Sequence, residues 1–280
     1  MENILLIAKK ELYHLFSSKL VILILIWYLL TFIISFYSIV NTPDGAESII
    51  SHFENPIDLI FVNFTYSLCY YGTLVGIILG FVSMSIETDG KALNTLLTKP
   101  VYRDTIINGK LLGLFIFFIC LFMFTISLYI FAMVVFYGVL LNSSSLLINS
   151  YIPLFIERVP LSFVLSFFCI TFFFSLSMLF SIISKEQSLS LFLSLFVWVM
   201  LFDVLNDFAF AGYLGYFFHS DSLTYDISCL SIYSMLYFIL GYTDIHNVIV
   251  HNGFELFKLF IYCFITIIFT YIVFLRRNVE

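Results

Sequence analysis

Charged residues are scarce in this chain. Only 11% of its 280 residues are Asp, Glu, Lys or Arg, whereas 62% are hydrophobic, and its mean hydropathy is +1.08. Soluble globular domains carry about 25% charged residues, so a water-soluble fold of this length would lack the polar side chains to cover its surface. Lipid must therefore cover part of the molecule. The composition predicts an all-α, polytopic membrane protein with a single transmembrane domain.

Motifs for nucleotide, metal and nucleic-acid chemistry are missing as well. No phosphate-binding loop GxxxxGK[ST] occurs; Gly109-Lys110, for example, lacks the upstream glycine and the following hydroxyl residue. The spacing Asp244-x-His246-x4-His251 matches no known metal-site geometry, and the five cysteines form no CxxC pair. No basic patch indicates nucleic-acid binding. We therefore expect no metal, cofactor or nucleic acid on this chain.

Long apolar runs are what the sequence has instead. A membrane helix needs about 20 mostly apolar residues to cross about 30 Å of hydrocarbon. Six runs are long enough, namely 20–40, 59–86, 111–140, 160–183, 188–206 and 254–275. Two shorter apolar stretches, 145–156 and 228–242, are typical of interfacial or re-entrant helices, and the second lies in a predicted outer loop at 207–253.

The basic residues predict the orientation of these spans. With six spans and a cytoplasmic N-terminus, ten Lys and Arg residues fall in cytoplasmic segments, and only Arg158 and Lys258 fall outside. The first outer loop, 41–58, has four acidic residues and no Lys or Arg. If 228–242 were a seventh span, the C-terminus would lie outside the cytoplasm together with the basic pair Arg276-Arg277, against the distribution of the other basic residues. We therefore expect six spans with both termini in the cytoplasm.

The residues before the first span, 1–19, form a predicted amphipathic helix. Its apolar face would hold Leu5, Ala8, Leu12, Leu15 and Phe16, and its polar face Lys10, Glu11 and His14. Such a helix should lie in the cytoplasmic interface with its lysines toward lipid head groups. The alternative is a charged leader that only sets the topology.

The segment between the second and third spans, 87–110, differs from the other inner loops because it holds seven charges. Leu93, Leu96 and Leu97 sit at helical spacing within it, and Pro100 stops the helix. A loop that only sets topology needs a few basic residues and nothing more. An amphipathic helix bracketed by charges favours a protein docking surface across the inner mouth; the charges are Glu87 and Asp89 on one side and Lys99, Arg103 and Lys110 on the other.

The same segment carries a resemblance to a known family. The run E-x-D-G-x-x-L-x-x-L-L-x-x-P-V-x-R-x-x-I-I-x-G-K-L, from Glu87 to Leu111, resembles the signature of ABC-2-type transporter permeases. The amphipathic N-terminal "elbow" helix, the six spans and the basic tail FLRRNVE also fit that family.

The resemblance implies a coupling helix that sits in a cleft of a separate ATP-binding subunit. The residues expected at that contact are Glu87, Asp89, Gly90, Leu93, Leu96, Leu97, Pro100, Arg103, Gly109 and Lys110. It further implies a second permease subunit, in a homodimer or heterodimer, and ATP and Mg in the partner subunit only. The chain would be a permease subunit of an exporter in the plasma membrane of a prokaryote, and no enzyme itself.

Two further sets of residues stand out. Gly72, Gly76 and Gly80 form a stripe on one face of the second span, where small residues let two helices approach closely; the alternative is the ordinary glycine content of membrane helices. Asp203, Asn206 and Asp207 close the fifth span. They are interpreted either as a solvated helix end or as an outer gate or substrate contact.

Two other functions compete with an ATP-driven permease. A secondary transporter usually shows broken helices, ionisable groups near the midplane and an internal repeat, and the sequence shows no repeat and essentially no charge near the midplane. A non-transport membrane protein, such as an assembly factor, predicts that no ATP-binding partner exists. The sequence does not identify a substrate, although the apolar spans favour an amphiphilic cargo over a small hydrophilic ion.

Overall fold

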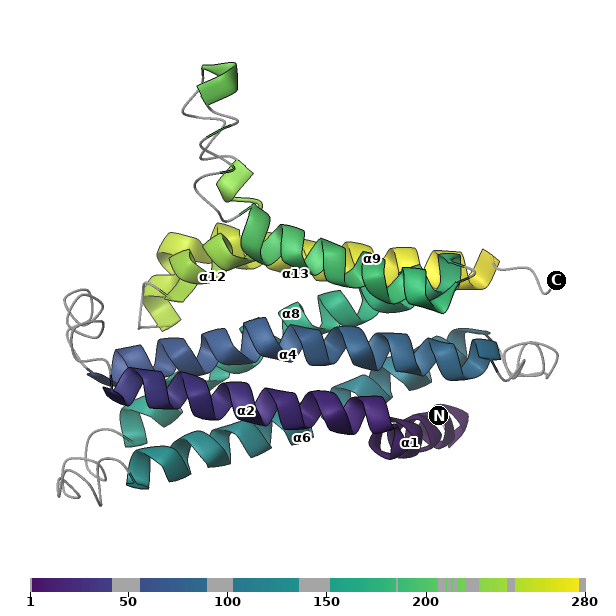
Figure 1. Cartoon of the computed structure of the whole chain (residues 1–280), viewed down its shortest axis with the longest axis horizontal. Coiled ribbons are helices and arrows are strands. Elements are labelled where there is room, and N and C mark those ends of the chain that lie inside the picture. Colours follow the sequence, from purple (N-terminus) through teal and green to yellow (C-terminus); the bar gives the residue numbers. More distant parts are fainter. Residues whose placement is uncertain are drawn as a thin grey trace.

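The computed structural model describes most of the chain as long helices (Figure 1). The described residues are 2–41, 56–89, 103–135, 152–184, 186–205, 210, 213, 216–219, 227–240 and 245–276. Within these ranges the elements are α1 (Glu2–Ser17), α2 (Lys19–Asn41), α4 (Pro56–Asp89), α6 (Arg103–Met133), α8 (Ile152–Ile183), α9 (Gln187–Val199), the π-helix η3 (Met200–Val204), α12 (Ile232–Leu240) and α13 (Ile245–Arg276).

The helices meet the requirements for crossing a membrane. Five of those described are long and apolar enough, and the bent pair formed by α1 and α2 raises the number to six. No strand occurs among the described residues. The prediction of an all-α polytopic membrane protein is therefore confirmed.

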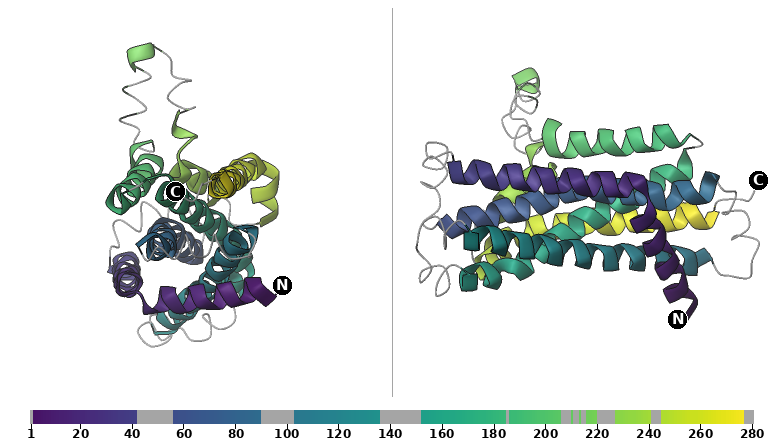
Figure 2. Two further views of the ribbon diagram at one scale, coloured as in Figure 1. Left: turned by 90° about the vertical axis from the view of Figure 1, so that its right-hand side faces the viewer. Right: turned by 60° about the horizontal axis from the view of Figure 1, so that its bottom comes forward.

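The first two helices form a bent pair. They meet at Ser18 at an angle of 67°, so α1 runs across one end of the bundle while α2 runs along it (Figure 2). The C-terminal end of α13 lies at the same end of the bundle as α1 (Figure 1). The first described helix and the end of the last one therefore lie at the same end of the bundle.

At the centre of the bundle lies α4. In its apolar span 72% of the residues are buried inside the protein, compared with 17% in α13. It packs along α8 on one side and is flanked by α2 and α9 on another (Figures 1 and 2). The spans of α6, α9 and α13 are 39%, 22% and 17% buried and leave most of their apolar surface outward, where the surrounding lipid covers it.

Several helices extend beyond the runs that hydropathy delimits. The structure continues α4 to Asp89 and begins α6 at Arg103, so the segment between them is shorter than the predicted loop 87–110. It also begins α8 at Ile152, inside the stretch 145–156, and keeps Pro160 within the helix. Helices need not stop where hydrocarbon stops, and membrane helices tolerate proline where other groups satisfy the freed carbonyl. Hydropathy locates the spans but not their ends.

The remaining predicted elements also have altered bounds. The fifth span consists of α9 followed by η3, and α13 begins at Ile245 with a kink at Asn252. The stretch 228–242 contains α12, a nine-residue helix that packs on α13. Its side chains Met235 and Leu236 are fully buried, because α12 leans against protein rather than lying free on a surface.

The glycine stripe of α4 faces α8. A Cβ atom added at Gly80 would stand 2.5 Å from the carbonyl oxygen of Phe174, and one added at Gly76 would stand 2.9 Å from the carbonyl oxygen of Ile170. At this contact Ser177 of α8 donates a hydrogen bond of 2.8 Å to the carbonyl of Ile77. The absence of side chains thus brings two backbones together, as expected for small residues in a membrane interface.

Replacing these glycines by alanine tests the contact. We expect Gly80→Ala and Gly76→Ala to destabilise the protein by about 1–3 kcal/mol, because the added methyl group meets backbone that has no room to move. Gly72→Ala should cost less, since its nearest neighbour at 3.0 Å is the flexible end of Ile170. Thermal unfolding in detergent measures how the three variants rank in stability.

The matched control is Gly253→Ala in α13, where no atom lies within 4 Å of the added Cβ. Alanine is the better helix former, so this variant should unfold at or slightly above the wild-type temperature. Equal losses at Gly80 and Gly253 would show that the close approach of α4 and α8 does not limit stability.

Candidate functional site

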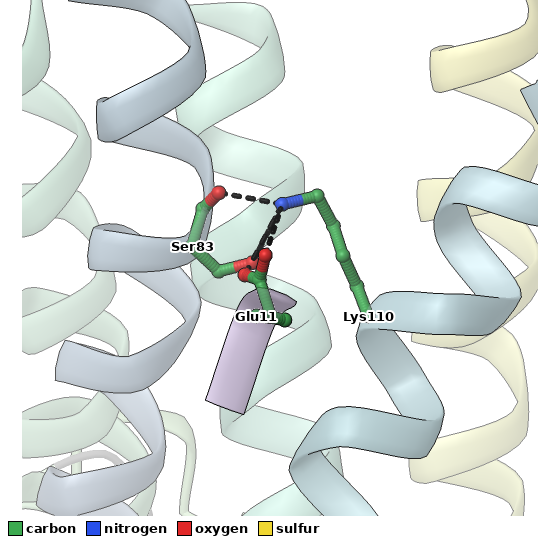
Figure 3. A network of polar contacts seen from close by, with 3 residues as sticks. All are labelled: Glu11, Ser83 and Lys110. Atoms are coloured by element: carbon green, nitrogen blue, oxygen red, sulfur yellow. Dashed lines mark hydrogen bonds and ion pairs between the residues drawn. The ribbon is translucent and has the colours of Figure 1, made fainter. Parts of the chain in front are cut away.

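Three helices meet in a buried polar cluster at the end of the bundle that carries α1; we call this the inner end, after the predicted topology, and the opposite one the outer end. Glu11 comes from α1, Ser83 from α4 and Lys110 from α6 (Figure 3). The Lys110 ammonium donates to both carboxylate oxygens of Glu11, at 3.2 and 3.3 Å, and to the carbonyl and hydroxyl oxygens of Ser83, at 2.6 and 3.0 Å. One cation therefore joins three elements that are distant in sequence.

Burial makes this cluster energetically important. Lys110 has no exposed surface and Glu11 is only 7% exposed. Removing two charges from water is costly, and their mutual attraction offsets that cost only with good geometry and further hydrogen bonds. Ser83 supplies those bonds. Loss of one partner would leave the other charge buried and unpaired, which is the most damaging change at such a pair.

The position of these two charges corrects the sequence analysis. Glu11 was assigned to the polar face of the amphipathic helix and Lys110 to the coupling loop, but the structure buries both between helices. The buried face of α1 includes Ala8, Glu11 and Leu15, whereas Leu5, which was assigned to the apolar face, is exposed. The pairing of opposite charges allows an acid to occupy the packed face.

Glycines of α6 make room for α1. A Cβ atom added at Gly109 would lie 2.6 Å from Cγ2 of Ile7, and one added at Gly113 would lie 3.4 Å from Cβ of Glu11. These two glycines are four residues apart and so share a face of α6. That spacing next to Lys110 was the signal in the sequence that a second helix packs here. Ser83 carried no comparable signal.

The structure describes only part of the predicted docking segment. Glu87 and Asp89 lie in the last turn of α4 and Arg103 is the first residue of α6, and their side chains are not among those described. Gly109 and Lys110 lie inside α6 and contact α1. The other predicted residues, Gly90, Leu93, Leu96, Leu97 and Pro100, lie outside the described residues.

A second polar group lies in the outer half of the bundle. Asp203 is an exposed residue of the π-helix η3, and Tyr70 of α4 donates a hydrogen bond of 3.1 Å to its carboxylate. Asn206 and Asp207 lie outside the described residues. Tyr70 is ten residues from Ile60, the outer end of the apolar span of α4, or about 15 Å along the helix. Asp203 therefore lies well below that end.

Aromatic rings pack around Tyr70, the hydrogen-bond partner of this carboxylate. The Tyr70 ring stacks on Tyr66, with 5.4 Å between ring centroids, and contacts Trp198 and Phe202 at 4.7 and 5.2 Å. Trp198 donates a hydrogen bond of 2.8 Å to Thr73. We call Trp27, Tyr66, Tyr70, Tyr71, Trp198, Phe202 and Tyr233 the aromatic cluster; its members come from α2, α4, α9, η3 and α12.

The described residues offer neither a metal-binding group of three His, Cys, Asp or Glu side chains nor a disulfide, since all five cysteines are free. Among the polar contacts that they do form are a helix-joining ion pair at the inner end and a carboxylate bonded to a ring of the aromatic cluster in the outer half. The first is suited to mechanical connection, and the second to contact with a solute.

Comparison with protein families decides the assignment. The model of the ABC-2 family transporter proteins matches residues 5–279, nearly the whole chain. The chain belongs to the ABC-2 transporter family. The resemblance noted at Glu87–Leu111 is thereby confirmed. No curated protein is significantly similar to the chain. This ABC-2 transporter protein is a membrane-embedded transport component, and the family is not itself an ATPase.

The ion pair of the ABC-2 protein is testable by stability. Lys110→Met should destabilise the fold by about 3–5 kcal/mol, because Glu11 is left buried without its partner. The double variant Glu11→Leu/Lys110→Met should recover most of this loss, since a buried pair replaced by apolar side chains is often neutral. Thermal unfolding in detergent gives both values.

Lys10→Met provides the matched control, because Lys10 is the exposed lysine next to Glu11 on α1. Its unfolding temperature should stay close to that of the wild type. If Lys110→Met also unfolded at the wild-type temperature, the cluster would not hold the three helices together.

Proposed function

We propose that this chain is the permease subunit of an ATP-driven exporter and that the segment 87–110 couples it to a separate ATP-binding subunit. The family assignment supports a transport role. The main support for coupling is the Glu11–Ser83–Lys110 cluster. It joins α4 and α6, the helices on either side of the segment, to the elbow helix α1. A force on the segment would reach α4, α6 and α1 as one unit.

Such stiffness is what coupling requires. A motor subunit that pushes on a loose loop moves the loop alone, whereas one that pushes between two joined helices tilts both. Gly109 and Gly113 keep α1 in contact with α6, and Gly76 and Gly80 keep α4 in contact with α8. A displacement at the inner end is therefore passed to the centre of the bundle through close backbone contacts.

The proposal includes an orientation. The excess of Lys and Arg in the segments on the side of α1 favours a cytoplasmic location for this end, and the end of α13 lies on the same side. Both termini would then be cytoplasmic, in the plasma membrane of a prokaryote. ATP and Mg would be bound by the partner, and a second permease subunit, identical or different, would complete the transporter.

Charge reversal in the segment tests the coupling. The tagged chain, purified from its native membrane, should bring down an ATP-hydrolysing subunit. We expect Glu87→Lys and Arg103→Glu to lower its recovery or its ATPase rate at least fivefold, because the contact depends on complementary charge. The measurements are subunit stoichiometry by mass spectrometry and phosphate release per complex.

Glu47→Lys is the matched control, because it reverses a charge in the predicted outer loop 41–58. It should leave both recovery and ATPase rate unchanged. If the two reversals in the segment behaved like Glu47→Lys, coupling through this segment would be wrong. Transport that continued on an ion gradient without ATP would favour a secondary transporter, and the lack of any ATPase partner would favour a non-transport role.

A further inference from the structure

Asp203 combines two properties that rarely occur together in a membrane protein. It is exposed on the surface of this chain, and its hydrogen-bond donor Tyr70 lies about 15 Å below the outer end of the span. A carboxylate that faces lipid at depth is costly, and intramembrane acids therefore usually face a water-filled cavity or a partner. The exposed side of Asp203 is thus not a lipid-facing surface.

The local backbone also sets this residue apart. Asp203 lies in the π-helix Met200–Val204, where the amide of Leu205 donates to the carbonyl of Met200 at 2.9 Å. π-helical turns are rare overall but frequent at functional sites, and this one closes the described part of the fifth span. Among the described ion pairs, which are Glu11–Lys110 and Glu255–Lys258, none includes Asp203. Within the described residues, the Asp203 carboxylate is stabilised by the hydrogen bond from the Tyr70 hydroxyl and by no cation.

The half-buried rings of the aromatic cluster are linked by ring contacts to Tyr70, the residue that contacts this charge. Tyr66 stacks on Tyr70 and meets Tyr233 edge-on at 5.4 Å, while Tyr71 meets Trp27 of α2 edge-on at 5.6 Å. These five rings each keep part of their surface accessible. Trp198 and Phe202 are buried behind Tyr70 and hold it in place.

We propose that Asp203 and the aromatic cluster bind an organic cation, such as a quaternary ammonium or phosphonium group on an apolar body. Aromatic faces attract cations through their quadrupole, most strongly where water is excluded, and they are the usual receptors for quaternary ammonium groups. One carboxylate supplies the balancing charge. A metal ion is usually held by several Asp, Glu, His or Cys side chains, and the described residues bring no three of these together. As the cargo class of a transporter, this inference rests on the proposed function.

The chain carries its own reporter for this site. It has two tryptophans, Trp27 and Trp198, and both belong to the aromatic cluster. We expect tetraphenylphosphonium to quench their fluorescence saturably when the purified chain is held in phosphatidylcholine nanodiscs. Tetraphenylborate has the same shape and the opposite charge, and it should give only the non-saturable quenching of a probe dissolved in lipid.

Substitutions identify the groups responsible. Asp203→Asn keeps the size and the hydrogen bond from Tyr70 but removes the charge, and it should weaken tetraphenylphosphonium binding about tenfold. Asp203→Glu should retain affinity within about threefold of the wild type. Glu157→Gln is the matched control, because Glu157 is also an exposed acid but lies on α8, outside the aromatic cluster. This variant should bind tetraphenylphosphonium as the wild type does.

Two results would overturn the proposal: no saturable quenching of the wild-type chain, or equal affinity of the wild type and Asp203→Asn. The assay contains no ATPase, so its failure would leave the permease assignment intact. Conversely, if the charge reversals at Glu87 and Arg103 had no effect, the proposed contact with the ATPase would be wrong, and the proposal of cation binding would be unaffected. The two proposals therefore fail separately.

Discussion

A lysine and a glutamate, buried side by side where three helices meet, hold the inner end of this bundle together. The cost of burying them is high, and it is offset only while both are present and Ser83 accepts the remaining hydrogen bonds. Helices in apolar contact can shift slightly at little cost, whereas a shift here would lengthen the hydrogen bonds on which the buried charges depend. α1, α4 and α6 must therefore keep their relative positions, and every proposal about how force enters the bundle depends on that constraint.

Away from this point small side chains bring some helices close together, and aromatic rings pack between others, as Phe118 of α6 does against Phe163 of α8. Glycines of α4 bring its backbone against α8, and hydroxyl groups bond across helices, as between Thr65 and Ser162 or Ser181 and Ser190. In lipid there is little hydrophobic force to drive helices together, so close packing and such hydrogen bonds take its place. The inner cluster fixes one end, and these weaker contacts extend the fit along the bundle.

The sequence predicted what depends on long, local patterns and missed what depends on distant pairs. Apolar runs of about 20 residues predicted the membrane helices because each run carries its own signal. Helix ends were wrong by up to nine residues, as at Arg103 instead of 111, Ile152 instead of 160 and Ile245 instead of 254, since charged, polar or proline-containing turns were read as loops. Lys110 was assigned to a loop because its partner Glu11 is 99 residues away, and no local pattern reveals such a pairing.

The π-helix at Met200–Val204 has a geometric consequence for the whole fifth span. An α-helix advances about 100° per residue, and a π-turn accommodates one residue more before the chain repeats its direction. The side chains that follow Met200 are therefore turned relative to the positions that an uninterrupted α-helix would give them. Removal of one residue here would restore a uniform helix and swing the carboxylate away from Tyr70. The extra residue thus allows the fifth span to bury Ser190 and Ser194 near its start and to place Asp203 beside Tyr70 of the aromatic cluster near its end.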